Sequence, residues 1–129
     1  MRMHAILGAA LLTACNTASE PSAPVVAAPK VERPVDLMAR VAKRAQACWY
    51  ARKDRRLAGT RLAAELDSYS GKPRILIVPR NAPQGLPKLV AEAQRVGGRN
   101  RFQRYGPLLD AKLAADLDRW AAGNPSCTA

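Results

Sequence analysis

The chain of 129 residues contains a single histidine, His4, and few acidic residues. Ten Asp and Glu stand against 21 Lys and Arg, which gives a net charge of +11 at pH 7. The longest apolar run, Ala5–Leu12, is far shorter than the ~20 residues of a membrane-spanning helix. No Cys-x-x-Cys pair and no Gly-rich phosphate loop is present. These absences exclude a P-loop nucleotide site and a dithiol redox motif.

Residues 1–14 are typical of a secretory signal peptide. Arg2 supplies a positive charge, Ala5–Leu12 forms a short apolar core, and Leu12-Thr13-Ala14 places small residues directly before Cys15. This segment resembles the lipobox of bacterial lipoproteins. The resemblance implies cleavage before Cys15 and attachment of acyl chains, diacylglycerol first and palmitate as a further chain, to that cysteine. A plain signal peptide with a chance cysteine is the alternative.

Cleavage before Cys15 changes the chemistry that the chain can perform. It removes His4, so the mature chain would contain no histidine, and it removes Arg2, which lowers the net charge to +10. A Ser-His-Asp triad, a Cys-His pair and histidine-containing metal sites are then excluded. We therefore expect no enzymatic activity, no catalytic residues, no cofactor and no metal. Asn16 after the lipidated cysteine favours the periplasmic face of the outer membrane, with the outer face of the inner membrane as the alternative.

Residues 15–34 form the second predicted segment, the lipidated cysteine followed by a proline-rich stretch. Its prolines are Pro21, Pro24, Pro29 and Pro34. Proline favours extended structure, and the stretch offers little apolar surface, so it should be a disordered tether whose full reach is on the order of 60 Å. The remaining residues, 35–129, have the length of one small domain.

The hydrophobic pattern of residues 35–129 predicts an α+β domain. Three- and four-residue spacings predict an N-terminal helix from Val35 to about Trp49 and a C-terminal helix over 111–122, capped by Asp110. The segments between them predict a four-stranded antiparallel meander, in which the second strand is apolar on both faces. Its strands are expected at 61–69, 72–79, 87–96 and 99–105, the last two joined by a turn at Gly97-Gly98. Both helices should cover one face of this sheet.

Two cysteines remain once Cys15 carries lipid. Cys48 lies at the end of the first predicted helix and Cys127 follows the last one. Because the exported side of the membrane is oxidising, these residues predict a structural disulfide that closes nearly the whole domain. Free thiols or a redox pair are the alternatives.

The positive charge suggests an anionic partner. Residues 33–61 and 71–105 each carry a net charge of +7. The candidate binding residues are Arg52, Lys53, Arg55, Arg56, Arg99, Arg101 and Arg104. Export argues against nucleic acid, so the expected partners are phospholipid headgroups, lipopolysaccharide, peptidoglycan or an acidic envelope protein. A basic surface that only keeps the protein in solution is the alternative.

Several segments resemble a family of small uncharacterised lipoproteins from alphaproteobacteria. They are Ala47-Cys48-Trp49, Arg61–Leu66 running on to Pro73–Pro79, Tyr105–Leu108, and Arg119-Trp120 before Cys127. The resemblance implies no activity or ligand. We therefore predict a non-enzymatic envelope lipoprotein with a basic binding domain. The alternatives are an accessory subunit of an envelope assembly complex, recognised through an apolar sheet face, and a hydrolase that uses Glu65 and Asp67.

Overall fold

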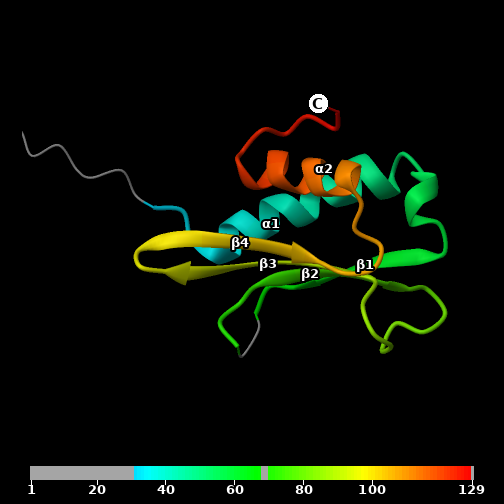
Figure 1. Ribbon diagram of the computed structural model, residues 1–129, viewed down its shortest axis with the longest axis horizontal. Coiled ribbons are helices and arrows are strands. Elements are labelled where there is room, and N and C mark those ends of the chain that lie inside the picture. The colour runs from blue at the N-terminus through cyan, green and yellow to red at the C-terminus, as the bar shows by residue number, and fades with distance from the viewer. Residues whose placement is uncertain (1–30, 68–69, 129) are drawn as a thin grey trace, which may run out of the picture.

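The computed structural model describes residues 31–67 and 70–128 (Figure 1). The predicted signal peptide, Cys15 and most of the predicted tether lie outside the described residues. In chain order the elements are α1 (Pro34–Ala45), a π-helical turn (Gln46–Tyr50), a 3-10 turn (Arg55–Leu57), β1 (Thr60–Glu65), β2 (Arg74–Pro79), β3 (Leu89–Val96), β4 (Arg99–Tyr105) and α2 (Ala111–Ala121). Within the described ranges, no helix is long and apolar enough to span a bilayer.

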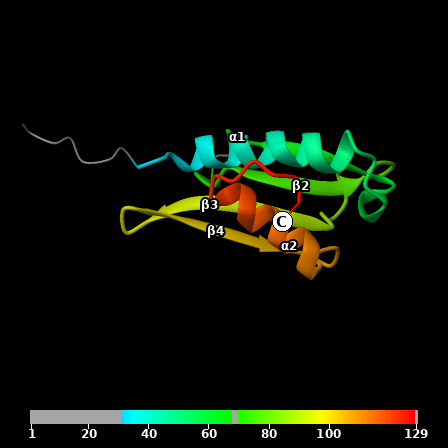
Figure 2. The same cartoon turned by 90° about the horizontal axis from the view of Figure 1, so that it is seen from above.

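The architecture is a two-layer α+β fold, as the sequence predicted. The four strands pair antiparallel in the order β1-β2-β3-β4. Helices α1 and α2 lie side by side on one face of the sheet, as Figures 1 and 2 show from two directions. Gly97 and Gly98, both with positive φ, make the two-residue turn between β3 and β4. The predicted cap is also present, because the Asp110 carboxylate accepts a 2.7 Å hydrogen bond from the backbone N–H of Leu113.

The element boundaries differ from the predicted ones at proline residues and at one strand end. Pro34 is the first residue of α1, where its missing N–H costs nothing. β2 begins after Pro73 and β3 begins after Pro87, because a proline has no N–H to donate to a strand pair. The first strand was expected to run to residue 69, but β1 ends at Glu65. Residues 68 and 69 of that prediction lie outside the described residues.

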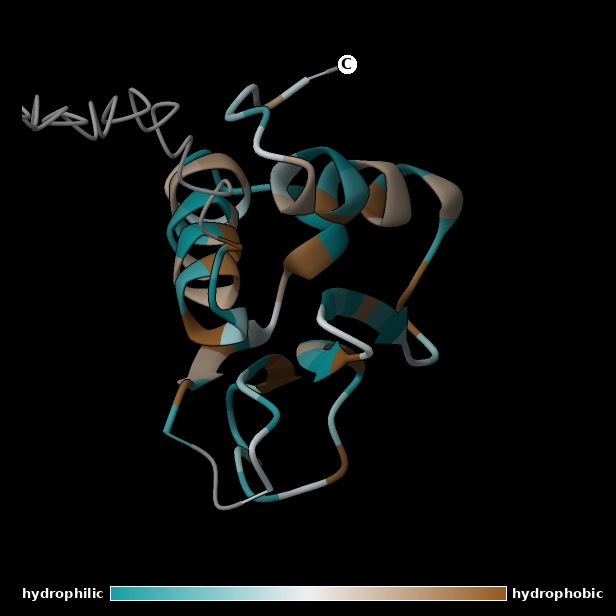
Figure 3. Ribbon diagram, turned by 90° about the vertical axis from the view of Figure 1, so that its left-hand side faces the viewer, coloured by the Kyte–Doolittle hydropathy of each residue, from teal (hydrophilic) through white to brown (hydrophobic). Residues whose placement is uncertain are grey.

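The core lies between the helices and the sheet face that they cover. Figure 3 shows this arrangement from the end of the sheet, with the hydrophobic residues of the ribbon in brown. Trp49 and Trp120 are almost fully buried, with their ring centroids 5.0 Å apart and their planes tilted by 58°. A tilted pair of this kind contributes about 1 kcal/mol beyond the area it buries. Ala91 and Ala93 of β3 are fully buried beneath α1, and their small side chains let the helix approach the sheet closely.

β2 is buried on both faces, as expected for a central strand. Ile75 and Ile77 point to the helices, whereas Leu76 and Val78 join Val90 on the opposite face. These last three side chains are only 9%, 2% and 6% exposed. The part of this sheet face that these three side chains form therefore presents little apolar area.

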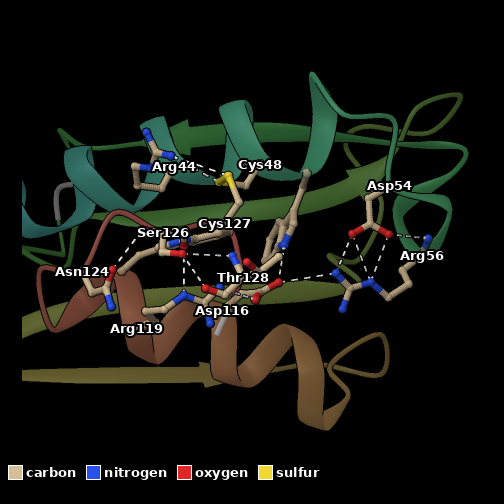
Figure 4. Close-up of a disulfide and its surroundings, with 12 residues drawn as sticks. Arg44, Cys48, Asp54, Arg56, Asp116, Arg119, Asn124, Ser126, Cys127 and Thr128 are labelled. Atoms are coloured by element: carbon tan, nitrogen blue, oxygen red, sulfur yellow. Dashed lines mark hydrogen bonds and ion pairs between the residues drawn. A yellow bond between two sulfur atoms is a disulfide. The ribbon is translucent and has the colours of Figure 1, made fainter.

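A disulfide joins Cys48 to Cys127, which confirms the predicted bridge. The Cα atoms are 5.2 Å apart and the two residues are separated by 79 positions. Cys48 belongs to the π-helical turn after α1, and Cys127 follows α2, so the bridge fixes the C-terminal segment against the first helix (Figure 4). The Arg44 guanidinium lies beside it, with Nη2 3.4 Å from the Cys48 sulfur and 3.6 Å from the Cys127 sulfur.

The end of the predicted tether is attached to the domain. The carbonyl of Glu32 accepts hydrogen bonds from Asn100 (2.7 Å) and Arg95 (3.1 Å), both in the β3–β4 hairpin. The carboxylate of Glu32 pairs with Arg40 of α1. Glu32, near the end of the predicted tether, is therefore held against the domain through both its carbonyl and its carboxylate.

Candidate functional site

The seven candidate cations do not form one surface. Arg52, Lys53 and Arg55 lie in the loop after α1, at one end of the sheet, whereas Arg99 and Arg101 lie near the hairpin at the other end (Figure 1). The side chains of Arg56 and Arg104 are engaged with carboxylates of the domain itself. The candidates therefore divide into two separate basic ends and two structural arginines.

The loop after α1 holds a compact backbone conformation. The N–H of Lys53 donates to the Tyr50 carbonyl, and the N–H of Asp54 donates to the Trp49 carbonyl. Lys53 has a φ of 52°, a left-handed conformation that turns the chain back toward the sheet. Asp54 then caps the 3-10 turn by accepting from the N–H of Arg56 at 3.0 Å. These backbone contacts therefore fix the positions from which the exposed side chains of the loop extend.

The only acidic residue of this loop is paired with its structural arginine. Arg56 donates to the Asp54 carboxylate at 2.5 Å, and this hydrogen bond is the main reason why the pKa of Asp54 lies below its ordinary value. Arg52, Lys53 and Arg55 are exposed, and none of them has an ion-pair partner in the part of the chain that the structure describes. Their three positive charges therefore face solvent uncompensated.

Asp116 of α2 contacts Trp49 and Arg56, the residues on either side of this loop (Figure 4). Its carboxylate accepts from Trp49 Nε1 at 2.9 Å and from Arg119 at 2.6 Å, and it lies 3.4 Å from Arg56. Asp116 is only 9% exposed. Buried carboxylates persist when several donors satisfy them, so this cluster is structural. It was missed in the sequence, although the spacing of Leu113, Asp116 and Leu117 puts the carboxylate on the buried stripe of α2.

Arg80 adds a fourth cation to the same end of the domain. It directly follows β2, and its N–H donates to the Gly59 carbonyl at 2.9 Å. The pKa of Tyr50 is raised, mainly by burial, while its hydrogen bond to Thr60 and the nearby Arg80 charge act in the opposite direction. The backbone hydrogen bond to Gly59 places Arg80 beside the end of the loop. We call Arg52, Lys53, Arg55 and Arg80 the distal basic cluster, because the loop after α1 and the end of β2 lie at the end of the sheet opposite to the β3–β4 hairpin (Figure 1).

The hairpin end carries Arg99 and Arg101 on the sheet face that points away from the helices. Strand alternation separates them from Phe102 and Arg104, which face α2. Arg104 makes a two-pronged ion pair with Asp118, both distances being 2.7 Å, and this pairing raises its pKa. Arg99 and Arg101 are exposed and have no ion-pair partner among the described residues.

Glu65 and Asp67, the carboxylates of the hydrolase alternative, have different surroundings. The Glu65 carboxylate lies 2.7 Å from Arg74 Nε. Asp67 lies beyond the end of β1, so the expectation that both carboxylates share one face of this strand is wrong. The Asp116 carboxylate is already occupied by its three donors. In residues 31–67 and 70–128, no group of three or more His, Cys, Asp or Glu side chains is arranged to hold a metal ion.

The fold and the surface charges define a small, disulfide-bonded α+β domain with a basic cluster at each end. No protein-family model, curated protein or solved structure matches the chain. Its function is therefore inferred from its own residues alone.

Proposed function

We propose that the protein is a non-enzymatic envelope lipoprotein whose distal basic cluster binds an anionic component of the envelope. Cys15 carries the lipid in this proposal, and Asn16 directs the protein to the periplasmic face of the outer membrane. The observation that carries the binding proposal is the uncompensated charge of Arg52, Lys53 and Arg55 on a loop whose single acid, Asp54, is held by Arg56.

The disulfide supports export of the domain. Disulfides form and persist on the oxidising side of the inner membrane, and a bridge between residues 79 positions apart is of the structural kind. The lipobox residues Leu12-Thr13-Ala14-Cys15 independently point to the same compartment. The two features lie in different parts of the chain and agree.

The position of the distal basic cluster suits a partner that lies away from the anchoring membrane. α1 and the π-helical turn run from Pro34 to Tyr50, about 25 Å at 1.5 Å per residue. The chain enters the domain at the start of α1, and the cluster follows its end (Figure 1). A tether attached at one end of the domain therefore leaves the other end free to face outward.

The size of the electrostatic attraction decides which class of anion fits. Each Lys or Arg close to an anionic surface contributes about 1 kcal/mol. The four cations of the distal basic cluster together give about 4 kcal/mol, which corresponds to a dissociation constant in the millimolar range. A single small anion would not reach all four cations and would bind more weakly than this. A surface of repeated charges, such as lipopolysaccharide phosphates, peptidoglycan peptides or an acidic protein face, lets weak contacts add.

Sedimentation with purified envelope fractions tests the proposal. Purified mature protein is mixed with peptidoglycan, lipopolysaccharide or anionic vesicles at low and at high salt. We expect salt-sensitive binding to one of them and its loss in Arg52→Glu/Lys53→Glu/Arg55→Glu, because the charges of the cluster are reversed.

The matched control is Lys43→Glu/Lys72→Glu/Lys112→Glu, which changes the net charge equally at sites outside the cluster. Retention of binding in this control identifies the cluster as the binding surface. Equal loss in both variants would show that only net charge matters, and absence of binding to every fraction at low salt would remove the proposed function.

A further inference from the structure

The hairpin end of the domain combines the entry of the tether with exposed cations and exposed apolar side chains. The Glu32 carbonyl accepts hydrogen bonds from Arg95 and Asn100, so the described part of the chain begins beside the β3–β4 hairpin. In the proposed lipoprotein, the membrane that holds Cys15 is therefore within reach of this end of the domain.

Two of the exposed large apolar side chains occur at this end. Val96, 47% exposed, is the last residue of β3 before the Gly97-Gly98 turn, and Val31, 50% exposed, directly precedes the fixed Glu32. Val96 pairs with Arg99 and shares its sheet face, which also carries Arg101. An apolar tip flanked by cations matches the boundary between lipid headgroups and acyl chains.

We propose that the tip of the β3–β4 hairpin docks on anionic phospholipid headgroups of the membrane that carries the lipid anchor. Val96 enters the headgroup region, while Arg99 and Arg101 pair with lipid phosphates. This inference rests on the proposed lipid anchor at Cys15. It adds an orientation to the proposed function, because docking of the hairpin directs the distal basic cluster away from the membrane.

Depth-dependent fluorescence quenching tests the orientation. Lipidated protein carrying Val96→Cys, labelled with a fluorophore, is reconstituted into phosphatidylethanolamine vesicles with or without phosphatidylglycerol. Cys48 and Cys127 are joined to each other and Cys15 is acylated, so the new thiol is the one that reacts. A headgroup-located quencher lipid should quench the label at position 96 strongly when phosphatidylglycerol is present. A label introduced by Lys53→Cys, in the distal basic cluster, should stay unquenched.

Replacing Arg99 and Arg101 by alanine should lower the ratio of docked to undocked protein roughly 30-fold, at about fivefold for each arginine. Vesicle flotation separates the two proposals. If the protein floats with the vesicles and the labels at 96 and 53 are quenched equally, the hairpin contact is wrong and the anchor stands. If the protein does not float, the anchor is wrong, and the hairpin contact that depends on it is overturned as well.

Discussion

The disulfide should contribute a large part of the stability of this domain. Removing a bridge that closes a loop of 79 residues restores entropy to the unfolded chain, and the chain-entropy relation gives about 4.5 kcal/mol for this loop. A domain of this size has a total unfolding free energy on the order of 5–14 kcal/mol. The double variant Cys48→Ala/Cys127→Ala should therefore unfold at a much lower urea concentration than the oxidised protein.

Tryptophan fluorescence is the appropriate readout, because Trp49 and Trp120 are buried in mutual contact and both become exposed on unfolding. Unfolding of the reduced wild-type protein gives a second measurement, because reduction breaks the bridge without removing the sulfur atoms. Both should lose about 4 kcal/mol in the free energy of unfolding. A loss below about 1 kcal/mol in both would refute the argument, since the bridge would then constrain nothing that the fold does not already hold.

Three further predictions concern the acidic residues and one glycine. Asp116→Ala should lower the free energy of unfolding in urea by about 3 kcal/mol, because Trp49 Nε1 and the Arg119 side chain, 10% exposed, lose their acceptor. Asp118→Ala, which removes an exposed ion pair, should lower it by less than about 1 kcal/mol. Similar losses in the two variants would contradict a structural role for Asp116. Gly106→Ala should lower the free energy of thermal unfolding by at least about 2 kcal/mol. Its φ is 129°, and an added Cβ would lie 2.5 Å from the Lys88 carbonyl oxygen. Gly97→Ala, whose Cβ would meet no atom within 4 Å, is the milder control, and an equal effect in both variants would refute the clash. Because the pKa of Asp54 is lowered in the folded state, its pair with Arg56 stabilises the fold above the unfolded-state pKa, near 3.8. This contribution is lost as the pH falls through the lower pKa of the folded state. Asp54→Asn should abolish this part of the acid dependence of stability, and an unchanged acid profile would contradict the prediction.

The fold could be predicted because its signals are local. The three- and four-residue spacings of α1 and α2, the β-branched run of β2 and the Gly97-Gly98 turn each specify one element, and the order of the elements then limits the topology. The end of β1 was missed because the alternation continues through Leu66. That residue packs against the core after it has left the strand.

The candidate site was only partly predictable, because pairing partners lie far apart in the sequence. Arg55 and Arg56 are adjacent and chemically identical, yet only Arg56 reaches Asp54 and Asp116, the latter 60 positions away. Arg104 likewise differs from Arg101 because it meets Asp118 of α2. The sequence lists the cations, whereas the packing of α2 determines which of them remain available to a partner.

In the proposed function, the distal basic cluster binds an anionic partner in the envelope. Site-specific photocrosslinking in native envelopes tests it most directly, with the photoreactive residue placed at Lys53 or, as a control, at Lys112 on α2. We expect an abundant adduct with one anionic component from position 53, lost when Arg52 and Arg55 are changed to Glu, and little adduct from position 112. Absence of an adduct at position 53, or equal adducts from both positions, would contradict it.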